Sequence, residues 1–228
     1  MPQIIPALIT SDNNSENDFK ELKLKFKKLQ PFLSEFDNWI QIDITDGKFV
    51  PTKTSMELED LKYFTERANV EFHLMVYKPE ETINEWAWLG PKRVIVHIEA
   101  VEDMNRLLNI CREKEIEVGL ALNPETANVM VEPWLGAVDL ITFLGVEPGM
   151  GGQAFIPEVL DKIKLLRQKF PNVKIEIDGG VRLANIGELK EAGADVFIVG
   201  SGILKSPNIS EAIKELFRLS GTPLSGKN

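Results

Sequence analysis

The stretch Arg93–Leu122, RVIVHIEAVEDMNRLLNICREKEIEVGLAL, contains the pattern that decides the fold. It begins with the short apolar run Arg93–His97, continues through a charged segment of helical period over Met104–Lys114, and ends in a second apolar run, Glu117–Leu122. Apolar runs rich in β-branched residues and leucine are typical of parallel strands that are buried on both faces. The stretch therefore predicts a strand, a helix and a second, parallel strand.

The same alternation extends along the chain in both directions. Amphipathic segments of helical period separate the apolar runs, most clearly at Asp18–Leu33, Pro157–Phe170 and Ser210–Leu219. Regular alternation of eight strands with helices predicts an α/β fold of the (β/α)8 or TIM barrel type, and a doubly wound open sheet is the alternative. The predicted strands are Ile4–Ile9, Trp39–Asp43, Val70–Met75, Arg93–His97, Glu117–Leu122, Leu140–Leu144, Lys174–Asp178 and Val196–Val199.

The length, the composition and the net charge of the chain limit its domain organisation and its possible partners. No linker-like segment divides the 228 residues, which predicts one barrel domain over residues 1–219 and a flexible tail over residues 220–228. The net charge of −9 argues against nucleic-acid and membrane partners. A small anionic substrate stays possible, because backbone N–H groups at helix starts bind phosphate.

The cysteine content and the N-terminus bear on the compartment. The single cysteine, Cys111, lies in a helix-like segment and is expected to pack rather than react. One cysteine allows no internal disulfide, and the first residues lack the pattern of a secretory signal. We therefore expect a cytoplasmic protein.

Two aspartates, Asp43 and Asp178, end apolar runs that are far apart in the sequence. A buried strand that ends in a carboxylate is costly unless the carboxylate binds a ligand or takes part in chemistry. Gln41 precedes Asp43 by two residues, so both side chains face the same side of the strand. His73 comes from another strand end, where barrels gather their chemistry. Together these side chains fit an acid/base pair or a site for Zn²⁺, Mn²⁺ or Fe²⁺.

Each of these residues also has a simpler interpretation. A lone aspartate at a strand end often caps a helix, and Asp178 precedes two glycines that make a turn. Asp46-Gly47 is a turn dipeptide with a structural role. His73 could be a hydrogen-bonded core histidine, and we assign His97 to structure. The joint occurrence of Asp43, His73 and Asp178 at equivalent strand ends favours a functional site.

Three glycine-rich segments follow the last three predicted strands. They are Glu147–Gln153, Asp178–Gly180 and Gly200–Gly202. Phosphate sites in these barrels form from the last loops, where backbone without side chains can approach an anion. One such cluster could be only a turn, whereas three on neighbouring strands indicate a phosphate site.

With these motifs the chain resembles the ribulose-phosphate 3-epimerases over roughly residues 4–218. The motifs that carry the resemblance are Asp43–Pro51, His73–Met75, Val96–Ala100, Leu122–Pro124, Pro148–Pro157, Asp178–Val181 and Gly200-Ser201.

The resemblance implies an isomerase that acts on a pentulose 5-phosphate through a cis-enediolate. Asp43 and Asp178 would be its acid and base, and one divalent metal ion would be bound by Gln41, Asp43, His73 and Asp178. It also implies a homo-oligomer in carbohydrate metabolism, with a small sugar phosphate as its partner. The residues that would contact substrate or phosphate are Ala7, Met75, Gly149, Met150, Gly151, Gly152, Gly179, Gly180, Gly200 and Ser201.

The chain departs from the family pattern at several of these positions. Gln41 stands where the family has a histidine ligand, which should weaken zinc binding and favour a harder ion such as Mn²⁺ or Mg²⁺. Ala7 stands in place of a serine that contacts substrate, and Thr45 in place of a methionine. The segment from Thr10 to Asn38 is longer than usual.

These departures leave two alternatives. The first is a catalytically impaired barrel that binds a phosphosugar, which Gln41 and Ala7 favour. The second is another phosphosugar enzyme, a decarboxylase or an aldolase, which would need a lysine in the site. The decarboxylase relatives carry Asp-x-Lys-x-x-Asp, whereas here Asp43 is followed by Ile44 and Thr45, and Lys48 lies beyond the turn.

Overall fold

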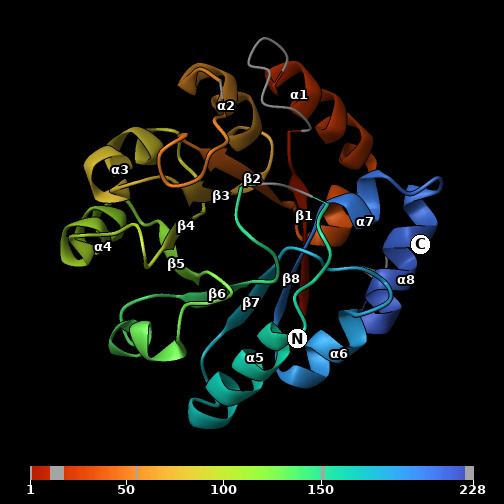
Figure 1. Cartoon of the computed structure of the whole chain (residues 1–228). Coiled ribbons are helices and arrows are strands. Elements are labelled where there is room, and N and C mark those ends of the chain that lie inside the picture. The colour runs from red at the N-terminus through yellow and green to blue at the C-terminus, as the bar shows by residue number, and fades with distance from the viewer. Residues whose placement is uncertain (1, 11–17, 55, 150–151, 224–228) are drawn as a thin grey trace.

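Eight parallel strands form a closed barrel in the computed structural model, which describes residues 2–10, 18–54, 56–149 and 152–223 (Figure 1). Each strand pairs with the next, and β8 pairs with β1. This closure confirms the predicted barrel over the open sheet. Every predicted strand is found, with ends that differ by at most two residues. The strands are β1 (Gln3–Leu8), β2 (Trp39–Thr45), β3 (Asn69–Met75), β4 (Arg93–His97), β5 (Glu117–Leu122), β6 (Leu140–Leu144), β7 (Ile175–Asp178) and β8 (Val196–Val199).

Helices surround the barrel on the outside. Between β5 and β6 the described chain forms two short 3₁₀ turns, η2 (Asn128–Met130) and η3 (Glu132–Trp134). The first helix ends four residues before the predicted Leu33 and continues as the 3₁₀ helix η1 (Gln30–Phe36), because Pro31 cannot donate a hydrogen bond within an α-helix. The α-helices are α1 (Asp18–Leu29), α2 (Leu58–Thr65), α3 (Pro79–Trp88), α4 (Met104–Glu113), α5 (Glu158–Lys169), α6 (Ile186–Ala192), α7 (Ser201–Leu204) and α8 (Ile209–Ser220).

The strands alternate between two buried environments. On β4, Val94 and Val96 belong to the large core between barrel and helices. Ile95 belongs to a separate cluster inside the barrel, with Ala121 and Leu140 among its members. Cys111 of α4 is buried in the outer core, and burial raises the pKa of its thiol to about 12, which agrees with the expected packing role.

Because side chains alternate between the two faces of a strand, every second residue points into the barrel, and polar side chains there form two layers. Asp43 and His73 are register partners on β2 and β3, and Gln41 and Glu71 are partners one step below them. The upper layer lies at the carboxyl ends of the strands. We call the buried side chains of Gln41, Glu71, Arg93, Thr142 and Glu176 the lower layer.

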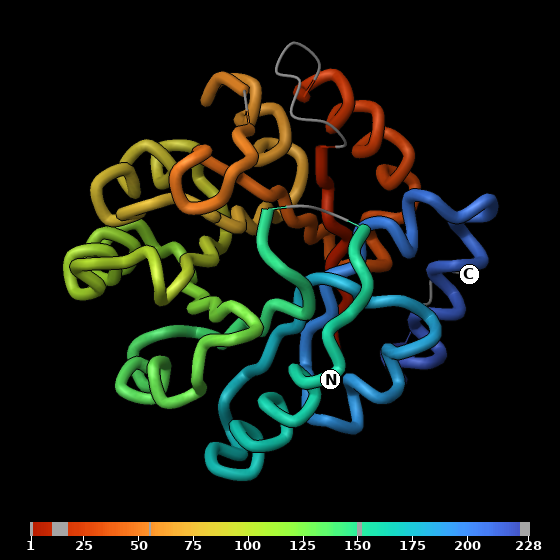
Figure 2. Tube along the Cα trace, in the orientation of Figure 1, coloured from red at the N-terminus to blue at the C-terminus, as the bar shows by residue number. Residues whose placement is uncertain are grey.

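The beginning and the end of the described chain lie together. Figure 2 shows the first strand, in red, beside the last, in blue, as their pairing requires. The Thr222 hydroxyl donates a hydrogen bond of 3.1 Å to the Pro2 carbonyl oxygen. Most of the predicted tail, residues 224–228, lies outside the described residues, so its flexibility stays a prediction. Within the described chain, no helix is long and apolar enough to cross a lipid bilayer.

Candidate active site

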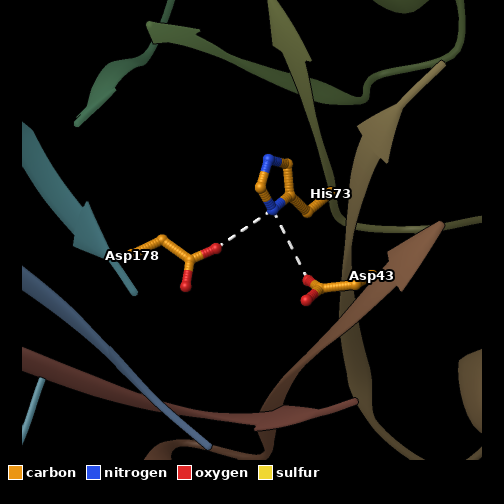
Figure 3. Close-up of side chains that lie close together, drawn as sticks. All are labelled: Asp43, His73 and Asp178. Atoms are coloured by element: carbon orange, nitrogen blue, oxygen red, sulfur yellow. Dashed lines mark ion pairs between the residues drawn. The ribbon is translucent and has the colours of Figure 1, made fainter. Parts of the chain in front are cut away.

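Asp43, His73 and Asp178 converge at the carboxyl ends of β2, β3 and β7 (Figure 3). The Nδ1 atom of His73 lies 3.0 Å from Oδ2 of Asp178 and 3.5 Å from Oδ1 of Asp43. One ligand atom from each residue lies within 4.8 Å of the others. Imidazole nitrogen and carboxylate oxygen are ordinary ligands of divalent ions, so this group is a possible metal site.

Burial and the close carboxylates shift the charges of this group. Burial raises the pKa of Asp43, although hydrogen bonds from His73 and Gln41 oppose the shift. Burial alone would lower the pKa of His73, but Asp178 and Asp43 outweigh it and raise this pKa to about 10. A proton on His73 therefore stabilises the two carboxylates. A metal ion at the same place would have to displace that proton.

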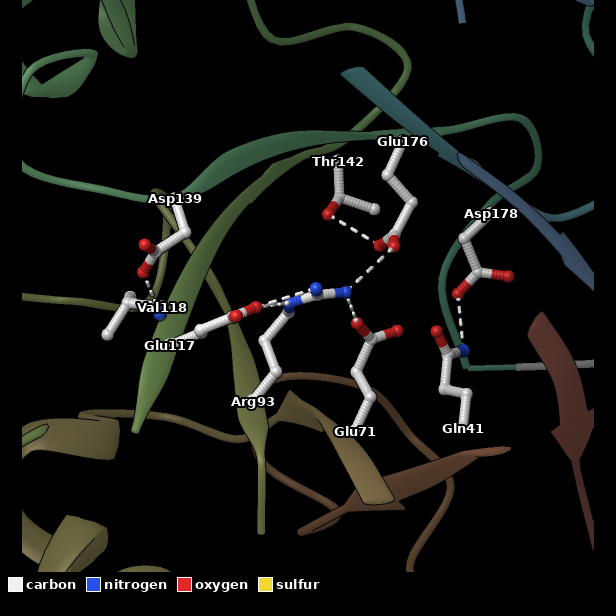
Figure 4. Close-up of polar contacts among 9 residues, drawn as sticks. All are labelled: Gln41, Glu71, Arg93, Glu117, Val118, Asp139, Thr142, Glu176 and Asp178. Carbon is white, nitrogen blue, oxygen red and sulfur yellow. Dashed lines mark hydrogen bonds and ion pairs between the residues drawn. The ribbon is translucent and has the colours of Figure 1, made fainter. Parts of the chain in front are cut away.

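Gln41 lies directly below the two carboxylates and is fully buried. Its amide nitrogen Nε2 donates hydrogen bonds of 2.8 Å to Oδ1 of Asp43 and 2.8 Å to Oδ2 of Asp178. Figure 4 shows the second of these bonds. The structure thus brings all four predicted metal ligands together, but Gln41 faces the carboxylates with a donor instead of a ligand oxygen.

His97 of β4 packs against the far side of His73. Their Nε2 atoms are 2.9 Å apart and the rings stack with centroids at 5.1 Å. Nδ1 of His97 lies 3.4 Å from Oε2 of Glu99. Burial lowers the pKa of His97, so its neutral ring can accept a hydrogen bond at Nε2 from the protonated His73. From its sequence pattern His97 was expected to have only a structural role, and its contact with His73 was not predicted.

A cavity of about 580 Å³ opens above the convergent group. Asp43, His73 and Asp178 line it, and Gln41 lies beneath. Its wall contains the described members of the predicted substrate-binding set. These are Ala7, Met75, Gly149, Gly152, Gly179, Gly180, Gly200 and Ser201. The other two members, Met150 and Gly151, lie outside the described residues.

The glycine-rich loops after β6 and β7 pack too closely against neighbouring loops to accommodate larger side chains. Gly180 has φ of +70°, and a Cβ atom there would lie 2.8 Å from Cα of Phe155. This close approach brings the loop after β7 against the loop after β6. The Thr52 hydroxyl donates to the Gly149 carbonyl oxygen at 3.0 Å, so the loop after β2 also contacts the loop after β6.

Asp46 organises the loop after β2. Its carboxylate accepts hydrogen bonds from the backbone N–H groups of Lys48, Phe49 and Tyr77. Partial burial would raise the pKa of Asp46, but these three donors hold it below the usual value. The contacts agree with the structural role predicted for the Asp46-Gly47 turn.

The lower layer contains charged residues that were not predicted from the sequence. Nη1 of Arg93 lies 2.6 Å from Oε2 of Glu71 and 3.8 Å from Oε2 of Glu176 (Figure 4). Thr142 donates a hydrogen bond of 2.9 Å to Oε1 of Glu176. A signal was present in the sequence, because Glu71 and Glu176 each precede a site residue, His73 or Asp178, by two positions and so face the same interior.

The family model described as the ribulose-phosphate 3 epimerase family matches residues 16–204. The chain belongs to this family. A ribulose-phosphate 3-epimerase of Schizosaccharomyces pombe is 32% identical over 218 residues, covering 94% of this chain and 92% of the relative. One from Escherichia coli strain K12 is 34% identical, covering 78% of this chain and 81% of the relative. One from Synechocystis is 38% identical over 184 residues, 77% of this chain and 80% of the relative.

Solved structures share the fold of this epimerase family member at low sequence identity. A 3-hexulose-6-phosphate synthase from Salmonella typhimurium has a TM-score of 0.66 at 16% identity, covering 96% of this chain and 98% of that chain. An orotidine 5'-monophosphate decarboxylase from Sulfolobus solfataricus has a TM-score of 0.63 at 13% identity, covering 97% and 98%. These likenesses concern the fold alone. Membership of the epimerase family confirms the predicted family and the predicted isomerase class.

Proposed function

We propose that this chain is a 3-epimerase that interconverts ribulose 5-phosphate and xylulose 5-phosphate, or a closely related pair of ketose phosphates. The observation that carries the proposal is the approach of Asp43 and Asp178, from different strands, to one imidazole nitrogen at the floor of the cavity. One carboxylate removes the proton from C3, which leaves a cis-enediolate. The other returns a proton to the opposite face and inverts the carbon.

The protonation of the two carboxylates suits this exchange. A carboxyl group can give and take a proton efficiently when its pKa approaches the working pH. Burial moves the pKa of Asp43 in that direction. Without a bound ion, a proton on His73 keeps a positive charge beside both carboxylates and limits their mutual repulsion; a bound divalent ion would take over this role.

The donor set fits one divalent ion. Asp43, His73 and Asp178 would hold it, and Gln41 would complete the set if its amide oxygen replaced the nitrogen that now faces them. A bound Zn²⁺, Mn²⁺ or Fe²⁺ stabilises developing negative charge on the substrate oxygens. Carboxylate and carbonyl oxygens together favour the harder Mn²⁺ over Zn²⁺.

The substrate phosphate would bind at the glycine loops after the last three strands. The predicted contacts are Gly149–Gly152, Gly179, Gly180, Gly200 and Ser201, with Ala7 and Met75 lining the sugar. Several lysines add positive charge to the same cavity, which helps a chain of net charge −9 to attract an anion. They are Lys25, Lys28, Lys53 and Lys205.

The remaining expectations belong to the same proposal. We expect one domain over residues 1–219, a cytoplasmic homo-oligomer and no nucleic-acid or membrane partner. The oligomeric state can be measured by sedimentation velocity of the purified protein.

Deuterium exchange tests the proposed reaction. The purified protein, with added Mn²⁺ or Zn²⁺, is incubated with ribulose 5-phosphate in D₂O, and the C3 position is followed by NMR. We expect metal-dependent exchange together with formation of the epimer. Absence of exchange with every ketose phosphate and metal tried would refute the proposal.

A second candidate is a barrel that binds a phosphosugar without turning it over. The observation that favours it is the double donation of Gln41 to Asp43 and Asp178, which occupies lone pairs on both carboxylates. Gln41→His distinguishes the candidates, because it restores the family ligand. A large gain in epimerisation indicates a weakened epimerase, whereas no turnover before or after the change supports the binding protein.

A further inference from the structure

Gln41 and Glu71 present two buried acceptor atoms to each other. They are register partners on β2 and β3, and both side chains are fully buried. Figure 4 shows the amide oxygen of Gln41 and the carboxylate of Glu71 turned toward one another. Among the described residues, neither Oε1 of Gln41 nor Oε1 of Glu71 has a hydrogen-bond partner. Buried acceptors without a donor are costly, so this pair calls for an explanation.

The amide of Gln41 has two orientations of nearly the same shape. In the observed one, both Nε2 hydrogens serve the carboxylates of Asp43 and Asp178. A cation between those carboxylates would meet the N–H groups of the amide, which is unfavourable. Reversal of the amide places Oε1 toward the cation and Nε2 toward Glu71. The reversed orientation therefore gives both orphaned oxygen atoms a partner.

We propose that the Gln41 amide reverses when a divalent ion binds, and that Glu71 is the positioning residue that holds it in the ligating orientation. The inference rests on the proposed metal-dependent function and adds a residue to it. Glu71 would accept a hydrogen bond from Nε2, in the way that an outer carboxylate orients a metal ligand.

The lower layer supports this role of Glu71. Arg93 donates to Oε2 of Glu71 at 2.6 Å, which leaves Oε1 available on the side of Gln41. On its other side, Nε and Nη2 of Arg93 donate to Oε2 of Glu117 at 2.8 and 2.6 Å. Arg93 is thereby held from both sides and keeps the Glu71 carboxylate in place.

Glu71→Gln tests the assignment with the least change in shape. The new carboxamide can still accept from Arg93, and its N–H can donate to Oε1 of Gln41, which favours the orientation that does not ligate. We expect Mn²⁺ binding, measured by competition with a fluorescent chelator, to weaken about 10- to 100-fold. The melting temperature in excess EDTA shows whether the variant folds.

Glu176→Gln is the matched control. Glu176 lies in the same layer, contacts the same arginine and precedes a proposed ligand by two residues, but its partner is Thr142. Glu176→Gln makes the same carboxyl-to-carboxamide change at a residue whose described contacts are Arg93 and Thr142, so we expect Mn²⁺ affinity to change less than about threefold. The double variant Gln41→Leu/Glu71→Gln should bind Mn²⁺ no more weakly than Gln41→Leu alone.

Three results of the binding measurements would overturn the inference. They are equal losses of Mn²⁺ affinity in Glu71→Gln and Glu176→Gln, no loss in Glu71→Gln, or an undiminished loss in the Gln41→Leu background. C3 exchange by a wild-type protein that binds no Mn²⁺ would also overturn it and leave the epimerase proposal intact. If Glu71→Gln weakens Mn²⁺ binding only when Gln41 is present, but the wild type shows no C3 exchange, the epimerase proposal would be refuted and this inference would stand. Should Glu71→Gln not fold, Glu71→Asp shortens the same carboxylate and should weaken Mn²⁺ binding likewise.

Discussion

At the scale of single residues, the site depends on a histidine held between two acids. His73 gains a proton because Asp43 and Asp178 are close. The two carboxylates can in turn lie near each other because the charge on His73 and the Gln41 amide N–H groups offset their mutual repulsion. These effects are mutual, so a change at one residue alters the protonation of the others.

The pKa of His73 predicts how stability changes with pH. The folded-state pKa of about 10 lies above the ordinary value of 6.5, so the folded protein binds more protons than the unfolded chain between these values. The contribution of His73 to stability is complete below pH 6.5 and is lost as the pH rises through 10. We expect the melting temperature in EDTA to fall across this range. The slope should be smaller in His73→Gln, and equal slopes would contradict the prediction.

Single substitutions of the two aspartates should separate their roles. Asp43→Asn and Asp178→Asn each remove one proton-transfer group while keeping the shape, so epimerisation should drop by about 10²- to 10⁴-fold. Each variant should still exchange the C3 proton of one epimer, and the two variants should prefer opposite epimers. NMR in D₂O, with bound metal measured in parallel, checks this. Exchange of the same epimer by both would argue against two opposed bases.

At the scale of elements, the short loops after the strands determine what can bind. The loop after β7 passes so close to Phe155 that Gly180 has no room for a side chain. The loops after β2 and β6 contact each other through Thr52 and Gly149. The proposed phosphate site is therefore built from backbone whose position depends on neighbouring loops.

Gly180→Ala should harm substrate binding specifically. The added Cβ meets Phe155 at 2.8 Å and the φ of +70° is unfavourable for alanine, so the loop must shift. We expect the KM for the sugar phosphate to rise about tenfold, corresponding to about 1.4 kcal/mol. Gly187→Ala, in α6 with nothing within 4 Å of the new Cβ, is the control and should leave KM unchanged. An equal KM in both variants would contradict the prediction.

The strands also depend on the charge balance of the lower layer that their side chains form inside the barrel. Arg93→Met would leave Glu71 and Glu176 buried without their cation. Breaking a buried ion pair in this way typically costs about 3–5 kcal/mol. Urea unfolding should show this loss. The same change at the exposed Arg218, which pairs with Glu215 on α8, should leave the free energy of unfolding nearly unchanged. A small effect at Arg93 would mean that the acids carry protons instead.

At the scale of the whole molecule, closure of the barrel joins the two ends of the chain. β1 pairs with β8, and the Thr222 hydroxyl reaches the Pro2 carbonyl. The side chain of Ser220 is buried at the end of α8. These contacts predict that the described chain unfolds as one cooperative unit.

Truncation tests where this unit ends. Removal of residues 223–228 should leave one unfolding transition at an unchanged temperature. Removal of residues 220–228 also deletes buried Ser220 and the bond to Pro2, so we expect a melting temperature lower by a few degrees. Calorimetry distinguishes these outcomes. Equal melting temperatures for both truncations would place the end of the domain at residue 219, as the sequence predicts.

The amino-acid sequence alone determined the barrel and the position of its chemistry. Strand ends were predictable to within two residues, because apolar runs alternate with polar or amphipathic segments along the chain; the connection from β5 to β6, which forms only two 3₁₀ turns, departs from the predicted alternation with helices. The convergence of Asp43, His73 and Asp178 was predictable as well. In a closed parallel barrel all carboxyl ends lie at the same rim, so residue type and strand position suffice.

Only the tertiary structure decided how the buried polar groups pair. Gln41 and Asp178 are 137 positions apart, and their hydrogen bond depends on the register of the strands around the closed barrel. The sequence showed an unexpected glutamine, but not that its nitrogen would face the acids and its oxygen Glu71. The contacts of His97 with His73, and of Arg93 with both glutamates, have the same origin. A hydrogen bond forms only when donor and acceptor are placed to within a few tenths of an ångström, and the packing of the barrel sets that placement.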